Sequence, residues 1–395
     1  MSHRANLQKV YASGFLFNVS YLTFAVLIPL DALQQHLPVW MVGILAAIPG
    51  VLQLPTRILS GPLVDWLGER WVLWVTFLLA SLAGLIVVAG EAFPMAALVV
   101  GQLFMGAARG LFWIAAQAEV SRQPGNRAQY LGLFTSYTKG GALIGIAAAG
   151  GIAEILGIVG GFVLAGSLSF MALVIGLTLP KREMNARPAS LLGAVQRLWP
   201  ASRKPFVVVN GLVALLCAIP QSLAQSFYPV VLIRLGLSDS AASLVTALMS
   251  LGMILSGIMG ARVLQRIGMK RMVAYSTALV AVSLFFTAVH QIGVDGVAIF
   301  LGGFAAGWLN IAFLTAVSAR SQDGDRGTNL GVTQVYFVVA MAATPLLSGW
   351  LLSAIGRPET FLVEGLLALG VALLVVLLWR WQDRPQGEGR QEKPA

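Results

Sequence analysis

The chain contains twelve apolar runs, and each is long enough to cross a lipid bilayer as an α-helix. A spanning helix needs about 20 predominantly apolar residues. Of the 395 residues, 57% are hydrophobic and only 11% are charged, whereas soluble domains carry roughly a quarter charged residues. The sequence therefore predicts an all-α polytopic membrane protein with twelve transmembrane helices, at 10–31, 39–62, 71–90, 94–118, 128–153, 157–179, 206–232, 240–262, 272–291, 296–319, 328–354 and 359–381.

The basic residues gather in alternate loops, and this distribution predicts the orientation. With both termini and the even-numbered loops on one side, the other side holds only Arg234 and Arg357. By the positive-inside rule, both termini are predicted to be cytoplasmic. The net charge of +10 then reflects topology in a lipid bilayer, and nucleic acid is not an expected partner. We expect a monomeric, multi-pass plasma-membrane protein of the kind found in a bacterial inner membrane.

The longest internal connection, residues 181–205, predicts a boundary between two halves. It is basic and carries Leu191, Leu192, Val195 and Leu198 at helical spacing, a pattern typical of an interfacial helix. The predicted divisions are an N-terminal six-helix half at 1–180, a cytoplasmic basic linker at 181–205, a C-terminal six-helix half at 206–381 and a cytoplasmic tail at 382–395.

The two predicted halves repeat one another. Seven residues around the predicted fifth helix recur around the eleventh at identical spacing: Gly125, Arg127, Leu131, Gly132, Tyr137, Gly150 and Gly157 match Gly324, Arg326, Leu330, Gly331, Tyr336, Gly349 and Gly356. The basic loop at 61–70 likewise has a second copy at 261–270. Parallel halves of six helices with a site between them near the midplane are the plan of many secondary transporters.

The first copy of this loop resembles the loop 2–3 signature of the major facilitator superfamily. The residues that carry the resemblance are Gly61, Leu63, Asp65, Gly68 and Arg70, and the twelve-helix layout agrees over nearly the whole chain. The resemblance implies the fold of that family, which moves solutes by alternating access.

The resemblance also implies a gating role for the loop, with Gly61, Asp65, Gly68 and Arg70 as its residues. Asp65 would contact the cytoplasmic start of the eleventh helix and hold the halves in an outward-facing state, because a helix N-terminus favours negative charge. The alternative is that these residues only form a tight, solvated turn. The second copy has Ala261 and Gln265 in place of Gly61 and Asp65.

Two departures from the family weaken an assignment to its multidrug exporters. A basic residue early in the fourth helix is common in the family, but this chain has Gln102 there. The proline of the Gly-Pro pattern that efflux antiporters often carry in the fifth helix is missing, although Gly141, Gly145, Gly150 and Gly151 are present.

Two cations lie inside predicted membrane spans at a common depth. Arg109 and Lys139 are each about ten residues from the cytoplasmic end of their helix, which places both roughly 15 Å deep. No acid of the first half lies near that depth. Since intramembrane charges usually pair or line a water-filled cavity, the substrate is a candidate for the missing counter-ion. The alternative is that both cations are satisfied by helix carbonyls and hydration.

Polar residues at helical spacing extend this candidate site, because such stripes should point away from lipid. The same stripes also suit packing between helices, and for the amides and tyrosines the sequence leaves both interpretations open. The predicted substrate-binding residues are Arg109, Lys139, Gln102, Trp113, Tyr137, Gln221, Gln225, Tyr228, Asn310 and Gln334.

The function predicted from the sequence is secondary active transport of a small organic anion, or of a solute with an anionic group. A multidrug exporter of the same superfamily and a non-transporting membrane sensor are the alternatives. No Walker-type loop is present, which excludes a pump that hydrolyses ATP itself. The lack of a His or carboxylate cluster at membrane depth disfavours an enzyme. The single cysteine, Cys217, excludes a disulfide framework and a thiolate metal site, and no cofactor or metal is expected.

A coupling ion is a possible second partner, but the sequence does not identify its site. Proton coupling usually needs a titratable group within the membrane. Glu364 and Asp31 are the deepest acids available, and their positions near predicted helix ends indicate interfacial residues.

Overall fold

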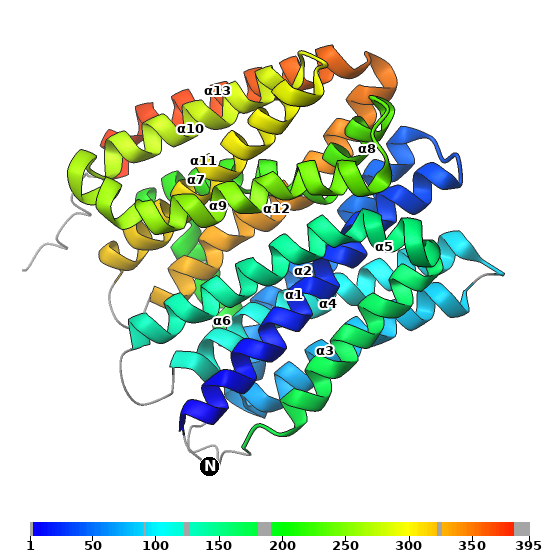
Figure 1. The fold of residues 1–395 in the computed structure, drawn as a ribbon. Helices are drawn as coiled ribbons and strands as arrows, with labels where there is room; N and C mark the ends of the chain where they lie inside the picture. The colour runs from blue at the N-terminus through cyan, green and yellow to red at the C-terminus, as the bar shows by residue number, and fades with distance from the viewer. Residues whose placement is uncertain (1–2, 91, 122–126, 181–190, 322–325, 383–395) are drawn as a thin grey trace, which may run out of the picture.

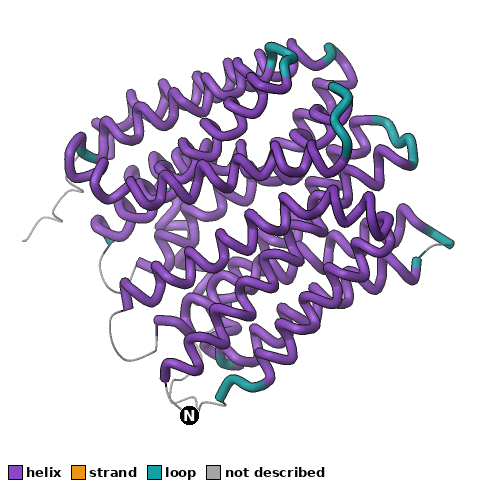
Figure 2. Tube along the Cα trace, viewed as in Figure 1, coloured by secondary structure: helices purple, strands orange, loops and turns teal. Residues whose placement is uncertain are grey.

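The computed structural model describes residues 3–90, 92–121, 127–180, 191–321 and 326–382. Within these ranges the regular structure is entirely helical (Figures 1 and 2). The helices are α1 (His3–Gln34), α2 (Val39–Leu67), α3 (Glu69–Ala89), α4 (Pro94–Ser121), α5 (Arg127–Leu177), α6 (Leu191–Ser202), α7 (Pro205–Gln225), α8 (Phe227–Arg234), α9 (Asp239–Ile267), α10 (Met269–Thr287), α11 (Ile292–Arg320), α12 (Arg326–Ala354) and α13 (Arg357–Gln382).

Helix α5 contains two of the predicted spans, separated by a reversal at Gly157. Gly157 has φ 72° and ψ 167°, a backbone conformation that glycine adopts without steric cost. The first arm of α5 packs parallel to α1, because Gly141 lies against Phe15 and Gly145 against Val19. The second arm runs antiparallel to α1, since Ser20 donates a hydrogen bond to the carbonyl of Ala165 and Gly161 lies against Leu27.

The predicted seventh span is divided into α7 and α8 by a break at Ser226, which has φ −133° and ψ −74°. Eleven helical segments are long and apolar enough to span a membrane, and one of them, Tyr130–Leu177, is the stretch that reverses at Gly157. Counting its two arms separately gives twelve crossings. The predicted fold, twelve helices in two pseudo-symmetric halves, is confirmed.

The duplication read from the sequence is visible in the turns. Gly68 joins α2 to α3 with φ 83° and ψ 155°, and Gly268 joins α9 to α10 with φ 79° and ψ 161°. Gly157 and its repeat mate Gly356 also both have positive φ. The repeated glycines are therefore required by a turn conformation that both halves share.

The two halves, α1–α5 and α7–α13, meet along two pairs of helices, α2 with α12 and α5 with α9 (Figure 1). Helix α6 touches α2 of one half and α12 of the other. We call the end of the bundle that holds α6 and the start of α1 the linker end, and the opposite end the far end. The domain boundaries drawn from the sequence stay predictions, because residues 181–190 lie outside the described ranges.

At the far end the halves touch through glycines. A Cβ added at Gly43 would collide with the carbonyl oxygen of Pro345, and one at Gly150 would collide with the carbonyl oxygen of Asp239. Glu154 of α5 adds polar contacts across the same junction: its carboxylate accepts hydrogen bonds from the backbone N–H of Ser240, at 2.8 Å, and from the Ser240 hydroxyl. This carboxylate lies at the N-terminus of α9, where negative charge is favoured.

Toward the linker end the same helix faces separate. Gly61 on α2, Gly132 on α5, Gly257 on α9 and Gly331 on α12 continue the stripes that meet at the far end, yet no described atom lies within 4 Å of a Cβ built at any of them. The structure is therefore closed at the far end and splayed toward the linker end.

We expect Gly150→Ala to disfavour the closed far end, because the added methyl group would collide with the backbone of α9. A cysteine introduced at Ala46, about 10 Å from the far end of α2, should be labelled several-fold faster in Gly150→Ala than in the unaltered protein by a membrane-impermeant maleimide applied from the far side. Gly132→Ala, on α5 like Gly150, is the matched control, since its methyl group would enter open space. Equal labelling in both variants would contradict the packing role of Gly150.

We expect Glu154→Gln to weaken the far-end closure less than Glu154→Ala does. The amide keeps one acceptor for the N–H of Ser240 but removes the charge that the N-terminus of α9 favours. Double electron–electron resonance between spin labels at the far ends of α5 and α9 would measure the open fraction. An unchanged distance distribution in Glu154→Ala would show that the contact does not contribute to closure.

Candidate functional site

Two small polar cavities lie between the halves at mid-depth. The first, which we call the basic cavity, is lined by Asn18, Leu22, Arg109, Trp113, Thr138, Lys139, Ala142, Ile146, Gln221, Gln225, Met249, Ser250 and Met253. The second, the amide cavity, is lined by Tyr21, Ala25, Ala46, Pro49, Gly50, Gln53, Gln102, Ser222, Gln225, Ser226 and Met341. Each has a volume of about 20 Å³, room for one or two water molecules. Gln225 lines both and is the wall between them.

Arg109 is held by an amide and two aromatic rings. Its Nη1 donates to Asn18 Oδ1 at 2.8 Å, and the Nδ2 of Asn18 donates to the carbonyl of Gly14 at 2.7 Å, which orients the acceptor. The guanidinium carbon lies 4.3 Å from the centre of the Tyr21 ring and 5.1 Å from that of Trp113. Cation–π contacts stabilise the charge without neutralising it. Arg109 thus keeps its full positive charge in a fixed orientation.

Lys139 reaches from α5 to the other half. Its Nζ lies 3.8 Å from the Sδ of Met253 on α9, and a thioether is a weak acceptor for an ammonium group. No carboxylate lines the basic cavity, and neither Lys139 nor Arg109 forms an ion pair with a described acid. Two cations thus face a cavity between the halves without a countercharge from the described part of the chain.

Tyr21 and Gln225 link the halves above the basic cavity. The Tyr21 hydroxyl on α1 donates to Gln225 Oε1 on α7 at 3.1 Å. Since the same tyrosine ring covers Arg109, the cation is connected through one side chain to a residue of the opposite half. Movement of the halves relative to each other must therefore disturb the surroundings of Arg109.

The structure brings together six of the ten predicted binding residues. Arg109, Lys139, Trp113 and Gln221 line the basic cavity, Gln102 lines the amide cavity, and Gln225 lines both. Gln102 is buried and donates to the carbonyl of Leu45 at 3.0 Å, so part of its hydrogen-bonding capacity is used to hold α2.

The other four lie outside the lining of both cavities. Tyr137 is 48% exposed and stacks on Tyr11, with 5.3 Å between the ring centres. Tyr228 is buried within the second half. Asn310 and Gln334 are half-buried and also line neither cavity. Their role in binding stays a prediction.

Sequence reasoning missed Asn18, Tyr21 and Met253. Asn18 and Tyr21 are three residues apart on α1, a spacing that puts them on one helix face, and this was the available signal. The sequence contained no signal for Met253, because a methionine in an apolar helix is indistinguishable from a packing residue.

The loop between α2 and α3 is a tight turn anchored within its own half. Gly68 ends α2 and begins α3, while Gly61 faces open space. Arg70 Nη2 donates at 2.9 Å to the carbonyl of Leu177, the last residue of α5, and its guanidinium lies 4.4 Å from the centre of the Trp74 ring. The side chain of Asp65 lies outside the described part of the structure, and its latch role stays a prediction.

Comparison with known proteins agrees with this architecture. The family model described as Major Facilitator Superfamily matches residues 10–219 and again 206–395. No curated protein sequence matches the chain.

Among solved structures, the fold is similar to the nucleoside transporter NupG in its D323A form, with a TM-score of 0.75, 15% identity and coverage of 97% of this chain and 100% of that one. It is also similar to a POT family transporter in complex with 5-aminolevulinic acid, with a TM-score of 0.80, 14% identity and 96% of both chains covered. A bacterial homologue of the human lysosomal transporter Spinster, in an inward-facing and unoccupied conformation, has a TM-score of 0.77 at 14% identity, with 96% of this chain and 97% of that one covered. The twelve-helix architecture, with a family match over residues 10–219 and again over 206–395, establishes that this multi-pass membrane protein belongs to the major facilitator superfamily of transporters.

Proposed function

We propose that the protein is a secondary transporter of a small organic anion, or of a solute with an anionic group. The observation that carries the proposal is the pair of cations, Arg109 and Lys139, at a cavity between the halves that no described carboxylate lines. A charged side chain at the centre of a bilayer costs at least about 2.5–3.5 kcal/mol. A bound anion would offset part of this cost for both residues at once.

The two cations suit different parts of an anionic group. A guanidinium binds a carboxylate or phosphate through two parallel N–H donors, whereas an ammonium acts as a compact point charge. Tyr21 and Trp113 cover Arg109, and Asn18 accepts from Nη1. No other described residue accepts a hydrogen bond from this guanidinium, so its other N–H groups can meet a ligand in the guanidinium plane. Gln221 and Gln225 add neutral hydrogen-bonding groups from the second half.

Alternating access follows from the contacts that cross between the halves. A cavity of about 20 Å³ is too small for an organic solute, so a substrate must enter when the halves are further apart. The positive-inside rule assigns the linker end to the cytoplasm, and the splayed end would then be the inward one. Because Lys139 contacts Met253 and Tyr21 contacts Gln225, a ligand on the cations would bias the closure of the two halves.

We expect Arg109→Gln and Lys139→Gln each to weaken anion binding roughly 10- to 100-fold, because a hydrogen bond to a charged group contributes about 1.5–3 kcal/mol. Binding to the folded state raises apparent stability by mass action. The purified protein should therefore be stabilised against heat by succinate, benzoate or phenyl phosphate, and each variant should lose most of this shift.

The control is Arg262→Gln, which removes an exposed cation near the linker end of α9 and should leave the shift unchanged. Tetraphenylphosphonium, a lipophilic cation, tests the alternative of multidrug export. Unaltered anion affinity in both cavity variants, or stabilisation by tetraphenylphosphonium alone, would overturn the anion proposal.

A further inference from the structure

Glu364 is a buried acid of the second half that the cavities do not explain. It lies on α13, seven residues after Arg357, the first residue of the helix. It is therefore about 10 Å along α13 from the far end of the bundle. Its side chain is 5% exposed. Oε1 lies 2.5 Å from the hydroxyl of Ser348 on α12, while Oε2 has no hydrogen-bond partner among the described residues.

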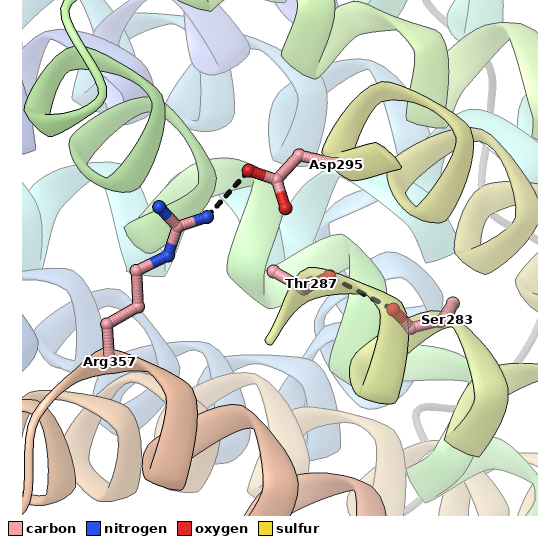
Figure 3. Close-up of polar contacts among 4 residues, drawn as sticks. All are labelled: Ser283, Thr287, Asp295 and Arg357. Carbon is pink, nitrogen blue, oxygen red and sulfur yellow. Dashed lines mark hydrogen bonds and ion pairs between the residues drawn. The ribbon is translucent and has the colours of Figure 1, made fainter. Parts of the chain in front are cut away.

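A second buried acid of this half, Asp295, is neutralised by an ion pair. Asp295 at the start of α11 is 1% exposed, and its Oδ2 accepts from Arg357 Nη2 at 2.6 Å (Figure 3). Figure 3 shows this pair beside Thr287, at the end of α10. Asp295 thus uses the cation that begins α13, and Glu364 forms no ion pair with a described residue. A buried carboxyl group without a cation is stable as the neutral acid.

Ser348 supplies the one hydrogen bond that Glu364 makes with a described residue. The Ser348 hydroxyl donates to Glu364 Oε1 at 2.5 Å, and its oxygen also lies 2.8 Å from the carbonyl oxygen of Thr344, four residues earlier on α12. A hydroxyl group has one proton to donate, so these two acceptors share it. One shared hydroxyl does not offset the burial of a carboxylate, and Glu364 is therefore favoured as the neutral acid.

The break between α7 and α8 lies at the amide cavity. Ser226, where α7 stops and α8 begins, lines that cavity. Tyr228, two residues into α8, is buried and lies within electrostatic range of both Glu364 and Asp295. A tilt of α8 at Ser226 would move Tyr228 and so change the surroundings of Glu364. A conformation that exposed Glu364 to water would stabilise the carboxylate, so the proton would leave there and bind again when α8 closes.

The other titratable groups around this acid are accounted for. Asp295 and Arg357 neutralise each other. Glu359 is exposed at the start of α13. His290, in the connection between α10 and α11, has its pKa lowered by burial and by Arg357, which keeps it neutral.

Helix α7, which packs on α13, contains no Asp, Glu, Lys, Arg, His or Tyr. Helix α10 also packs on α13, and its Lys270, Arg271 and Tyr275 are exposed near its linker end. On α12, Tyr336 lies twelve residues before Ser348.

We propose that Glu364 is the proton-binding residue that couples transport, and that a proton on Glu364 in the second half moves together with the anion held by Arg109 and Lys139 in the first. This inference rests on the proposed anion transport. The proton binds reversibly to the carboxylate and returns to water, and no covalent bond to the substrate forms or breaks.

The test is Glu364→Gln in proteoliposomes loaded for uptake of labelled succinate or phenyl phosphate. An inward pH gradient should drive accumulation in the wild type and in the control Glu359→Gln, and a protonophore should collapse it. Glu364→Gln should fall to the level of empty liposomes under the gradient yet keep counterflow exchange of the same anion, which needs no net proton movement. Glu364→Asp should restore part of the gradient-driven uptake.

A second measurement is independent of transport. At neutral pH, the infrared carbonyl band of a protonated carboxylic acid should be present in the wild type and Glu359→Gln, and lost in Glu364→Gln. Gradient-driven uptake by Glu364→Gln at the wild-type rate, loss of counterflow in folded Glu364→Gln, or an infrared band that this variant keeps would overturn the role of Glu364. Failure of the wild type to bind or move either anion would instead overturn the proposed function, and the coupling with it.

Discussion

The interior of a bilayer offers no hydrogen-bond partners, so every polar group at membrane depth must be satisfied by the protein itself. Many buried polar side chains are satisfied by backbone carbonyls of the bundle: Ser20 donates to the second arm of α5, Gln102 to the backbone of α2, and Asn18 to its own helix. Among the groups that remain incompletely satisfied, Arg109, Lys139 and Glu364 are charged or titratable. They lie where a ligand, an ion or a moving helix could complete them.

Five ionisable residues within the helices are compensated to different degrees. Asp295 and Arg357 form a complete pair. Arg109 contacts an amide and two aromatic rings, and Lys139 contacts one thioether. Glu364 accepts a hydrogen bond from one serine. The cations belong to the first half and the lone acid belongs to the second. A division of this kind would allow one half to bind the substrate and the other to bind the coupling proton. The hydrogen bond between Tyr21 and Gln225 links the two halves, so a movement of one half changes the surroundings of the other.

The length of the apolar runs and the repeat between the halves were enough to predict the fold, because membrane thickness leaves few alternatives to a bundle of spanning helices. They also predicted the depth of Arg109 and Lys139. The partners of these residues could not be predicted, because Asn18 is 91 residues from Arg109 and Met253 is 114 residues from Lys139. The sequence also predicted that Glu364 is an interfacial acid. The sequence indicates its depth, but the rotation of α13 that turns it toward Ser348 depends on packing between helices.

The far-end junction is made largely of backbone, since Gly43 faces the carbonyl of Pro345 and Gly150 faces that of Asp239. Freezing a long side chain on contact costs up to about 2 kcal/mol of rotamer entropy, whereas glycine has no rotamer to lose. A junction of this type is well packed when closed and pays almost no side-chain entropy each time it forms. Little side-chain entropy therefore opposes its closure.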